Sequence, residues 1–133
     1  MMILTFEETI SKTIAPFLKA IPVESGAAKL AAWRECVDVT LSEWARNPSR
    51  IKSEGIEPPT QAAIKLAGIL AADLRDAGCS GPTYIVPNNE GGVVFEWHGD
   101  STTALLEIEK SETVAVSVLT NHRVTFSQKF AAE

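Results

Sequence analysis

The hydrophobic positions along the chain change period once, near residues 78–82. Before this point apolar residues recur every three or four positions, as in an amphipathic helix, and after it they alternate with polar residues, as in a half-buried strand. The switch predicts an α+β fold, with about three N-terminal helices packed on one face of a five-stranded antiparallel meander sheet. We expect one domain over residues 1–133, with a helical part at 1–78 and the sheet at 83–130.

Two helices are expected in the first 47 residues. Thr5–Glu8 matches a capping box at the start of the first helix. This helix should end or kink near Ala15, because Pro16 lacks an amide hydrogen. The second helix should begin at Ser25-Gly26 and end at Asn47-Pro48. Its apolar stripe contains Leu30, Trp33, Val37, Leu41 and Trp44. At this spacing we interpret both tryptophans as core anchors.

The third helix is expected from Thr60 to Gly78, because glycine suits the left-handed position that ends a helix. Residues 47–59 have no period and contain Gly55, Pro58 and Pro59, so this segment is predicted to be a loop. The apolar face of the third helix is formed by Ala63, Leu66, Ala67, Leu70 and Leu74.

Turn positions predict the register of the sheet, since opposed residues of an antiparallel pair must point to the same face. We place the turns at Gly99-Asp100, at residues 110–112 and at residues 120–122. The core rows expected from these turns are Val93, Leu106, Val116, Phe126 and Phe95, Ala104, Val118, Val124. The outer rows are Glu96, Thr103, Leu119, Arg123 and Val94, Leu105, Ser117, Thr125.

The outer face of this predicted sheet is mixed, with Val94, Leu105 and Leu119 as an apolar island among polar residues. Contiguous exposed apolar residues indicate a binding surface or a covering segment. Two interpretations stay open: the N-terminal segment partly covers this face, or another protein does.

Charge and composition narrow the classes of function. The net charge is −5, and residues 83–133 carry three basic residues against seven acids. Because phosphate contacts dominate nucleic-acid affinity, an acidic sheet disfavours DNA or RNA binding. No apolar run reaches membrane length and the N-terminus lacks a signal-peptide pattern. Cys36 and Cys79 fit no disulfide framework, so we expect a cytoplasmic protein that does not act on membranes.

The one candidate polar cluster lies on the hairpin that carries Glu96, His98, Glu107 and Glu109. In the predicted register these side chains sit at different heights, and no local metal motif accompanies them. We therefore predict no metal, no cofactor and no catalytic residue, and interpret the charges as a solvated face. Glu96 stays unexplained, while Trp97 shares the parity of the core residues and should point inward.

The segment from Pro58 to Ile108 resembles a family of small uncharacterised bacterial proteins. The resemblance rests on Pro58-Pro59-Thr60, Pro82, Pro87, Gly91-Gly92, Phe95-Glu96-Trp97, Leu106 and Ile108. It implies the helix-then-sheet architecture and a bacterial source, and it brings no established activity.

Three functional hypotheses follow. The leading one is a non-enzymatic protein-interaction or self-associating module, either a homodimer or bound to a protein partner. The alternatives are a small enzyme or ligand-binding protein with a pocket near Glu96-Trp97-His98, and an antitoxin-like accessory protein. The candidate binding residues are Glu96, Trp97, His98, Val94, Leu105, Leu119 and Arg123.

Overall fold

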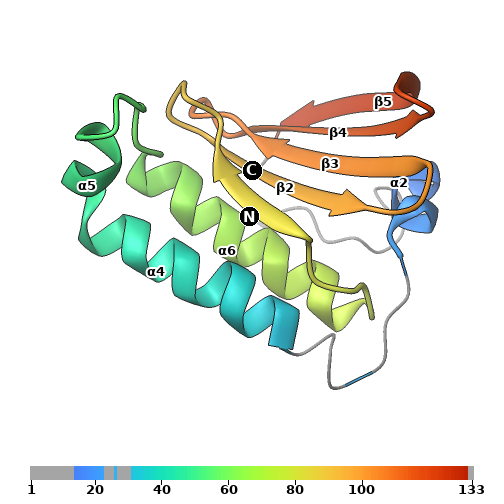
Figure 1. The fold of residues 1–133 in the computed structure, drawn as a ribbon, viewed down its shortest axis with the longest axis horizontal. Helices are drawn as coiled ribbons and strands as arrows, with labels where there is room; N and C mark the ends of the chain where they lie inside the picture. Colours follow the sequence, from blue (N-terminus) through green and yellow to red (C-terminus); the bar gives the residue numbers. More distant parts are fainter. Residues whose placement is uncertain (1–13, 23–25, 27–30, 132–133) are drawn as a thin grey trace.

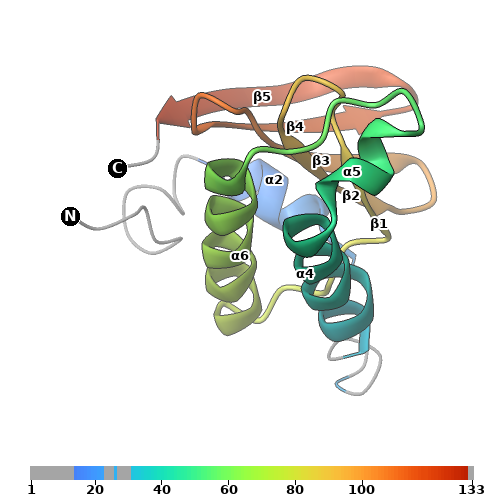
Figure 2. The ribbon, with the colours of Figure 1, turned by 90° about the vertical axis from the view of Figure 1, so that its left-hand side faces the viewer.

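The protein is built from a sheet and a layer of helices beneath it, as the computed structural model shows for residues 14–22, 26 and 31–131 (Figures 1 and 2). The helices are α2 (Ala15–Ala20), η1 (Ala32–Asp38), α4 (Val39–Arg46), α5 (Pro48–Lys52) and α6 (Gln61–Asp76). The strands are β1 (Tyr84–Pro87), β2 (Val93–His98), β3 (Thr102–Ile108), β4 (Thr113–Thr120) and β5 (Arg123–Ala131). The predicted α+β class is confirmed.

The five strands form one antiparallel sheet in the order β1-β2-β3-β4-β5, so each strand pairs with the next along the chain. Helix α2 packs beneath β3 and β4, and α6 packs beneath β2 and β3. The opposite face of the sheet lies above these helices (Figure 2). We call it the outer face.

Helix α6 follows the sequence prediction closely. The Thr60 hydroxyl accepts a hydrogen bond from the Ala63 amide at 3.1 Å, which satisfies one of the free amides at the helix start. Gly78 ends the helical segment with φ of 89°. The apolar face is buried as predicted, at Ala63, Leu66, Ala67, Leu70 and Leu74.

The number of helices was predicted wrongly. Among the described residues there are four α-helices and one π-helical segment instead of three helices. Pro16 lies in the first turn of α2, where its missing amide hydrogen has no helical partner in any case, and the helix expected before it lies outside the described residues. The loop predicted at 47–59 contains α5, with Pro48 in its first turn. The predicted capping box at Thr5–Glu8 and the start expected at Ser25 lie outside the described residues.

The tryptophan-containing helix runs continuously from η1 into α4 and ends at Arg46, as predicted. Trp33 and Val37 are fully buried, Leu41 is buried and Trp44 is half-buried. Over Ala32–Asp38 the turns widen to π-helical spacing, which the apolar pattern did not indicate. The interpretation of both tryptophans as packing residues agrees with their contacts in the core.

The register of the β3–β4 hairpin is as predicted, with Leu106 opposite Val116. The β2–β3 register is wrong by two residues, because the Gly99 amide bonds to the Thr102 carbonyl at 2.8 Å and Asp100-Ser101 form the turn centre. Phe95 therefore faces Leu106, and Trp97 faces Ala104. A shift of two keeps each side chain on its predicted face.

The β4–β5 register also differs from the prediction, because a bulge lies between Val118 and Leu119. Val118 faces Phe126, and Val116 faces Gln128 instead of Phe126. Val124 was predicted to be a core residue, and this is wrong: the bulge places it opposite Leu119, and it is 63% exposed.

The inner face of the sheet and the helix layer share one core. Trp97 is 1% exposed and contacts Phe17 edge to face, with ring centroids 5.5 Å apart. The predicted inward direction of Trp97 is correct. The inner rows of the sheet are Val93–Ile108–Val114–Phe130, Phe95–Leu106–Val116–Gln128 and Trp97–Ala104–Val118–Phe126.

Candidate functional site

The outer face carries a diagonal line of apolar side chains that takes one residue from each strand. Val86 pairs with Val94, Leu119 pairs with Val124, and Leu105 lies diagonally between these two pairs. We call these five residues the outer stripe: Val86, Val94, Leu105, Leu119 and Val124. Val86 is 37% exposed, Val124 is 63% exposed and the other three are half-buried.

Polar side chains flank the outer stripe on both sides. On one side lie Tyr84, Glu96 and His98 from the first two strands, and on the other lie Glu107 and Ser117. Tyr84 is 56% exposed, so it adds apolar ring surface to its side. An apolar centre with a polar rim is the usual composition of a protein-binding patch.

Glu96 is explained by its contacts on this face. The His98 imidazole lies 2.9 Å from the Glu96 carboxylate, measured from Nε2 to Oε1. An ionised carboxylate can only accept, so the Nε2–H group donates. Tyr84 lies directly opposite Glu96. The Tyr84 ring packs edge to face against the His98 ring, with ring centroids 5.4 Å apart. Glu96 and His98, the residues on either side of Trp97 in the chain, thus form a polar pair on the outer face, while the Trp97 indole is buried on the inner face.

A hollow of about 310 Å³ opens beside this pair, at the end of the sheet where two hairpin turns meet. Its lining includes His98, Asp100, Thr103, Leu119 and His122. His122 has φ of 68° in the β4–β5 turn, where Asn121 also has positive φ. This pair of left-handed residues fits a type I′ hairpin turn, so the position of His122 has a structural cause.

The sequence prediction named seven candidate residues, and the structure keeps five of them on the outer face: Val94, Glu96, His98, Leu105 and Leu119. It places Trp97 and Arg123 elsewhere. Trp97 lies in the core, on the other side of the sheet from the outer stripe. Arg123 pairs with Thr120, whereas Val124 takes the expected place opposite Leu119. Glu96 faces Leu105, not Thr103 as predicted, because of the shifted β2–β3 register.

Glu107 and Glu109 belong to a separate acidic hollow of about 440 Å³ at the opposite end of the sheet, together with Glu57, Glu90 and Lys110. Lys110 lies 4.0 Å from Glu57, and Lys129 lies 3.2 Å from Glu109. Within the described part of the chain, no group of three or more acidic, histidine or cysteine side chains is arranged to hold a metal ion.

Asn88 organises this acidic end, and the sequence analysis missed it. Its side-chain oxygen accepts from the amides of Glu90 at 2.8 Å and Gly92 at 2.7 Å, and its Nδ2 donates to Glu107 at 2.8 Å. The available signal was the Asn88-Asn89 pair just before Gly91-Gly92, because asparagine side chains commonly bond to the backbone two residues on.

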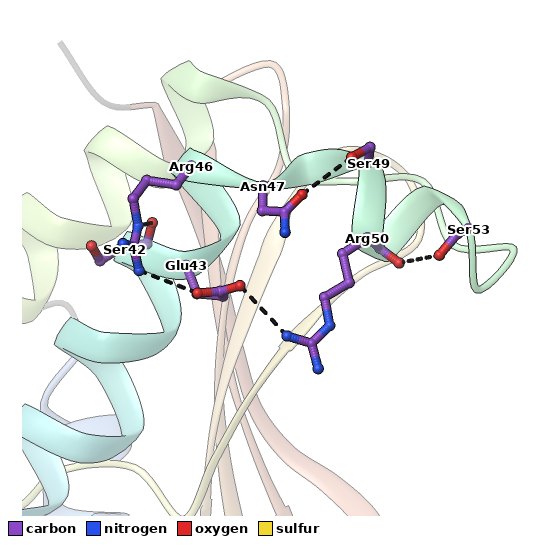
Figure 3. Close-up of polar contacts among 7 residues, drawn as sticks. All are labelled: Ser42, Glu43, Arg46, Asn47, Ser49, Arg50 and Ser53. Atoms are coloured by element: carbon purple, nitrogen blue, oxygen red, sulfur yellow. Dashed lines mark hydrogen bonds and ion pairs between the residues drawn. The ribbon is translucent and has the colours of Figure 1, made fainter.

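Basic residues gather where α4 meets α5 (Figure 3). The Glu43 carboxylate accepts from Arg46 at 3.2 Å and from Arg50 at 3.5 Å, so it lies between the two guanidinium groups. Both arginine side chains are about 70% exposed, at 72% and 69%. Ion pairs between side chains this exposed contribute little to stability.

Cys36 and Cys79 are half-buried. Burial raises the pKa of the Cys36 thiol above its ordinary value. A thiol with a raised pKa holds less of the reactive thiolate at neutral pH, so Cys36 is poorly suited to act as a nucleophile.

Of the helices in the described part of the chain, none has the length and hydropathy needed to cross a membrane. Comparison with protein-family models, curated proteins and solved structures finds no match for this chain.

Proposed function

We propose that this protein is an interaction module that binds a protein partner through the outer face of its sheet. The observation that carries the proposal is the outer stripe, a continuous apolar line across all five strands on the face opposite the described helices. A face that needed only to be solvated would carry polar residues at these positions.

The flanking residues suggest what the partner provides. Glu96 and Glu107 place a carboxylate on each side of Leu105. A partner with an apolar strip bordered by basic or amide side chains would match both the stripe and its rim. Charged groups at an interface rim set orientation and the rate of association more than affinity.

A photo-crosslinking experiment in cells of the source organism tests this function. A photoreactive amino acid replaces Leu105 in one variant and Val39 in the control, which is 58% exposed and lies in α4, away from the outer face. We expect one protein adduct, identified by mass spectrometry, from position 105. Leu119→Glu should abolish that adduct. Equal adduct patterns from both positions would contradict the proposal.

A second candidate function rests on the pairing of Glu96 with His98 at 2.9 Å beside the hollow of about 310 Å³. A carboxylate that fixes the imidazole through one nitrogen leaves the other nitrogen to bind a ligand or accept a proton. A thermal-shift screen of small polar ligands compares the native protein with His98→Gln. This alternative fails if no ligand raises the melting temperature of the native protein more than that of the variant.

A further inference from the structure

Strand β5 is an edge of the sheet along its whole length. It spans nine residues, Arg123–Ala131, and is the longest of the five strands. One side pairs with β4, and in the described part of the chain no strand pairs with the other side (Figure 1). A long free edge presents unpaired N–H and C=O groups that favour pairing with another strand.

The two edges of the sheet are protected very differently. Strand β1 at the other edge has four residues, ends at Pro87 and follows Pro82 closely. Proline and a short strand both discourage pairing. Strand β5 contains no proline, and its inward-facing residues beyond the bulge are the uncharged Phe126, Gln128 and Phe130. The bulge affects only the first part of β5, beside Val124.

We propose that two copies of this chain pair antiparallel through β5 and form a continuous ten-stranded sheet. The two-fold axis passes midway between the two strands at Gln128, so Gln128 lies opposite Gln128 of the second copy. Phe126 then lies opposite Phe130 of the second copy, and both rings are on the inner face. Their rings are half-buried in one chain, at the margin of the core, and the pairing covers that margin.

Other symmetric registers are less favourable for stated reasons. An axis at Lys129 places two lysines directly opposite each other, and like charges at such positions are destabilising. An axis at Ser127 places Phe130 opposite Val124, which the bulge has turned to the outer face. With the axis at Gln128, Lys129 lies opposite Ser127 and keeps its own ion pair with Glu109 at 3.2 Å.

This arrangement also determines how the two outer faces lie. In an antiparallel edge pairing the two-fold axis is perpendicular to the sheet, so both outer stripes face the same side. The dimer goes beyond the proposed partner binding and rests on the strand edge alone. Variants at residues 127–129 of β5 leave Leu105 and Leu119 unchanged, so they test the dimer without altering the outer stripe. The dimer and the proposed partner binding can therefore be refuted separately.

Charge substitutions at the axis provide the first test, read by light scattering after size exclusion. We expect the native chain to elute at twice its mass of 14.3 kDa. Gln128→Glu and Gln128→Lys should each elute as monomers, and their equimolar mixture should recover the dimer. The matched control Ser127→Glu should stay dimeric, because it faces Lys129 of the second copy.

A monomeric native chain at its highest soluble concentration would overturn the proposal. Equal dissociation of Ser127→Glu and Gln128→Glu, each shown to be folded by circular dichroism, would also overturn it. Photo-crosslinking at position 128 provides a further check. Capture of a different protein at this edge, instead of a second copy of the chain, would also contradict the homodimer.

Cysteine crosslinking tests the register, in chains that carry Cys36→Ser and Cys79→Ser. Directly opposed residues have Cα atoms about 4.5–5.5 Å apart, within the range of a disulfide. Gln128→Cys alone should form a covalent dimer on oxidation, whereas Ser127→Cys and Lys129→Cys should do so only when mixed with each other. If Ser127→Cys crosslinks alone as fast as Gln128→Cys, the axis is not at Gln128.

Discussion

The indoles of Trp33 and Trp97 donate hydrogen bonds to consecutive carbonyl oxygens, those of Cys79 at 2.9 Å and Ser80 at 2.8 Å. Trp33 lies in the helix layer and Trp97 lies in the sheet. The segment between α6 and β1 is therefore fixed from both layers at once. This double contact sets where the first strand begins relative to the helices.

Replacement of Trp97 by phenylalanine should destabilise the protein by about 2–4 kcal/mol. The substitution leaves the buried Ser80 carbonyl without its donor and creates a cavity beside Phe17. Urea unfolding followed by circular dichroism measures the change. Trp44→Phe is the control, because Trp44 is half-buried, and it should cost clearly less. Equal losses in the two variants would contradict the importance of the carbonyl contact.

Gly81 lies in the same segment, and its lack of a side chain allows a close approach to η1. A Cβ at this position would lie 2.7 Å from the Ala32 Cβ and 2.9 Å from the Trp33 amide nitrogen. Gly81→Ala should therefore cost about 1–3 kcal/mol through overpacking. The control is Gly68→Ala in α6, where no atom lies within 4 Å of the added Cβ. That control should stabilise the helix by about 0.5–1 kcal/mol. Thermal unfolding of both variants checks the opposite signs.

Asn88 links the β1–β2 turn to the β3 carboxylate of Glu107, so an acid at this position should be unfavourable. Asn88→Asp keeps the acceptor for the turn amides but replaces the donor to Glu107 with a second negative charge. We expect a loss of about 1–3 kcal/mol at neutral pH. In the background of Glu107→Gln the same substitution should cost less, since the amide can donate to the new carboxylate. A double-mutant cycle measures this coupling, and additive losses would show that the contact contributes nothing.

The sequence predicted which side chains of most helices and strands point into the core, but it did not predict the register of every strand pair. Helix α6 was predictable because Thr60, Gly78 and the apolar spacing between them agree with one another. The β2–β3 register was missed because Gly99 fits two positions in a turn equally well, and only the hydrogen bond to Thr102 decides between them. Both choices keep Phe95 in the core, so the hydrophobic pattern could not distinguish them.

The candidate site was less predictable than the core. The pairing of Glu96 with His98 follows from their shared face, which the alternation along β2 indicated. The outer stripe depends on the bulge that brings Val124 opposite Leu119, and no local sequence signal marks an extra residue in a regular strand. Sequence reasoning therefore found three of the five stripe residues and selected Arg123 in place of Val124.

Cys36 should make the stability of the protein depend on pH in the alkaline range. Burial raises the pKa of this thiol in the folded state, so the unfolded thiol ionises first as the pH rises. Below the pKa of the unfolded state the thiol is protonated in both states, and its full contribution to the free energy of unfolding is present. Above it the unfolded state binds fewer protons than the folded state, so stability falls until the pH passes the folded pKa. Cys36→Ala should therefore lose less stability than the native protein between about pH 7 and pH 10. Urea unfolding at several pH values measures the difference, and parallel curves for the native protein and Cys36→Ala would refute it.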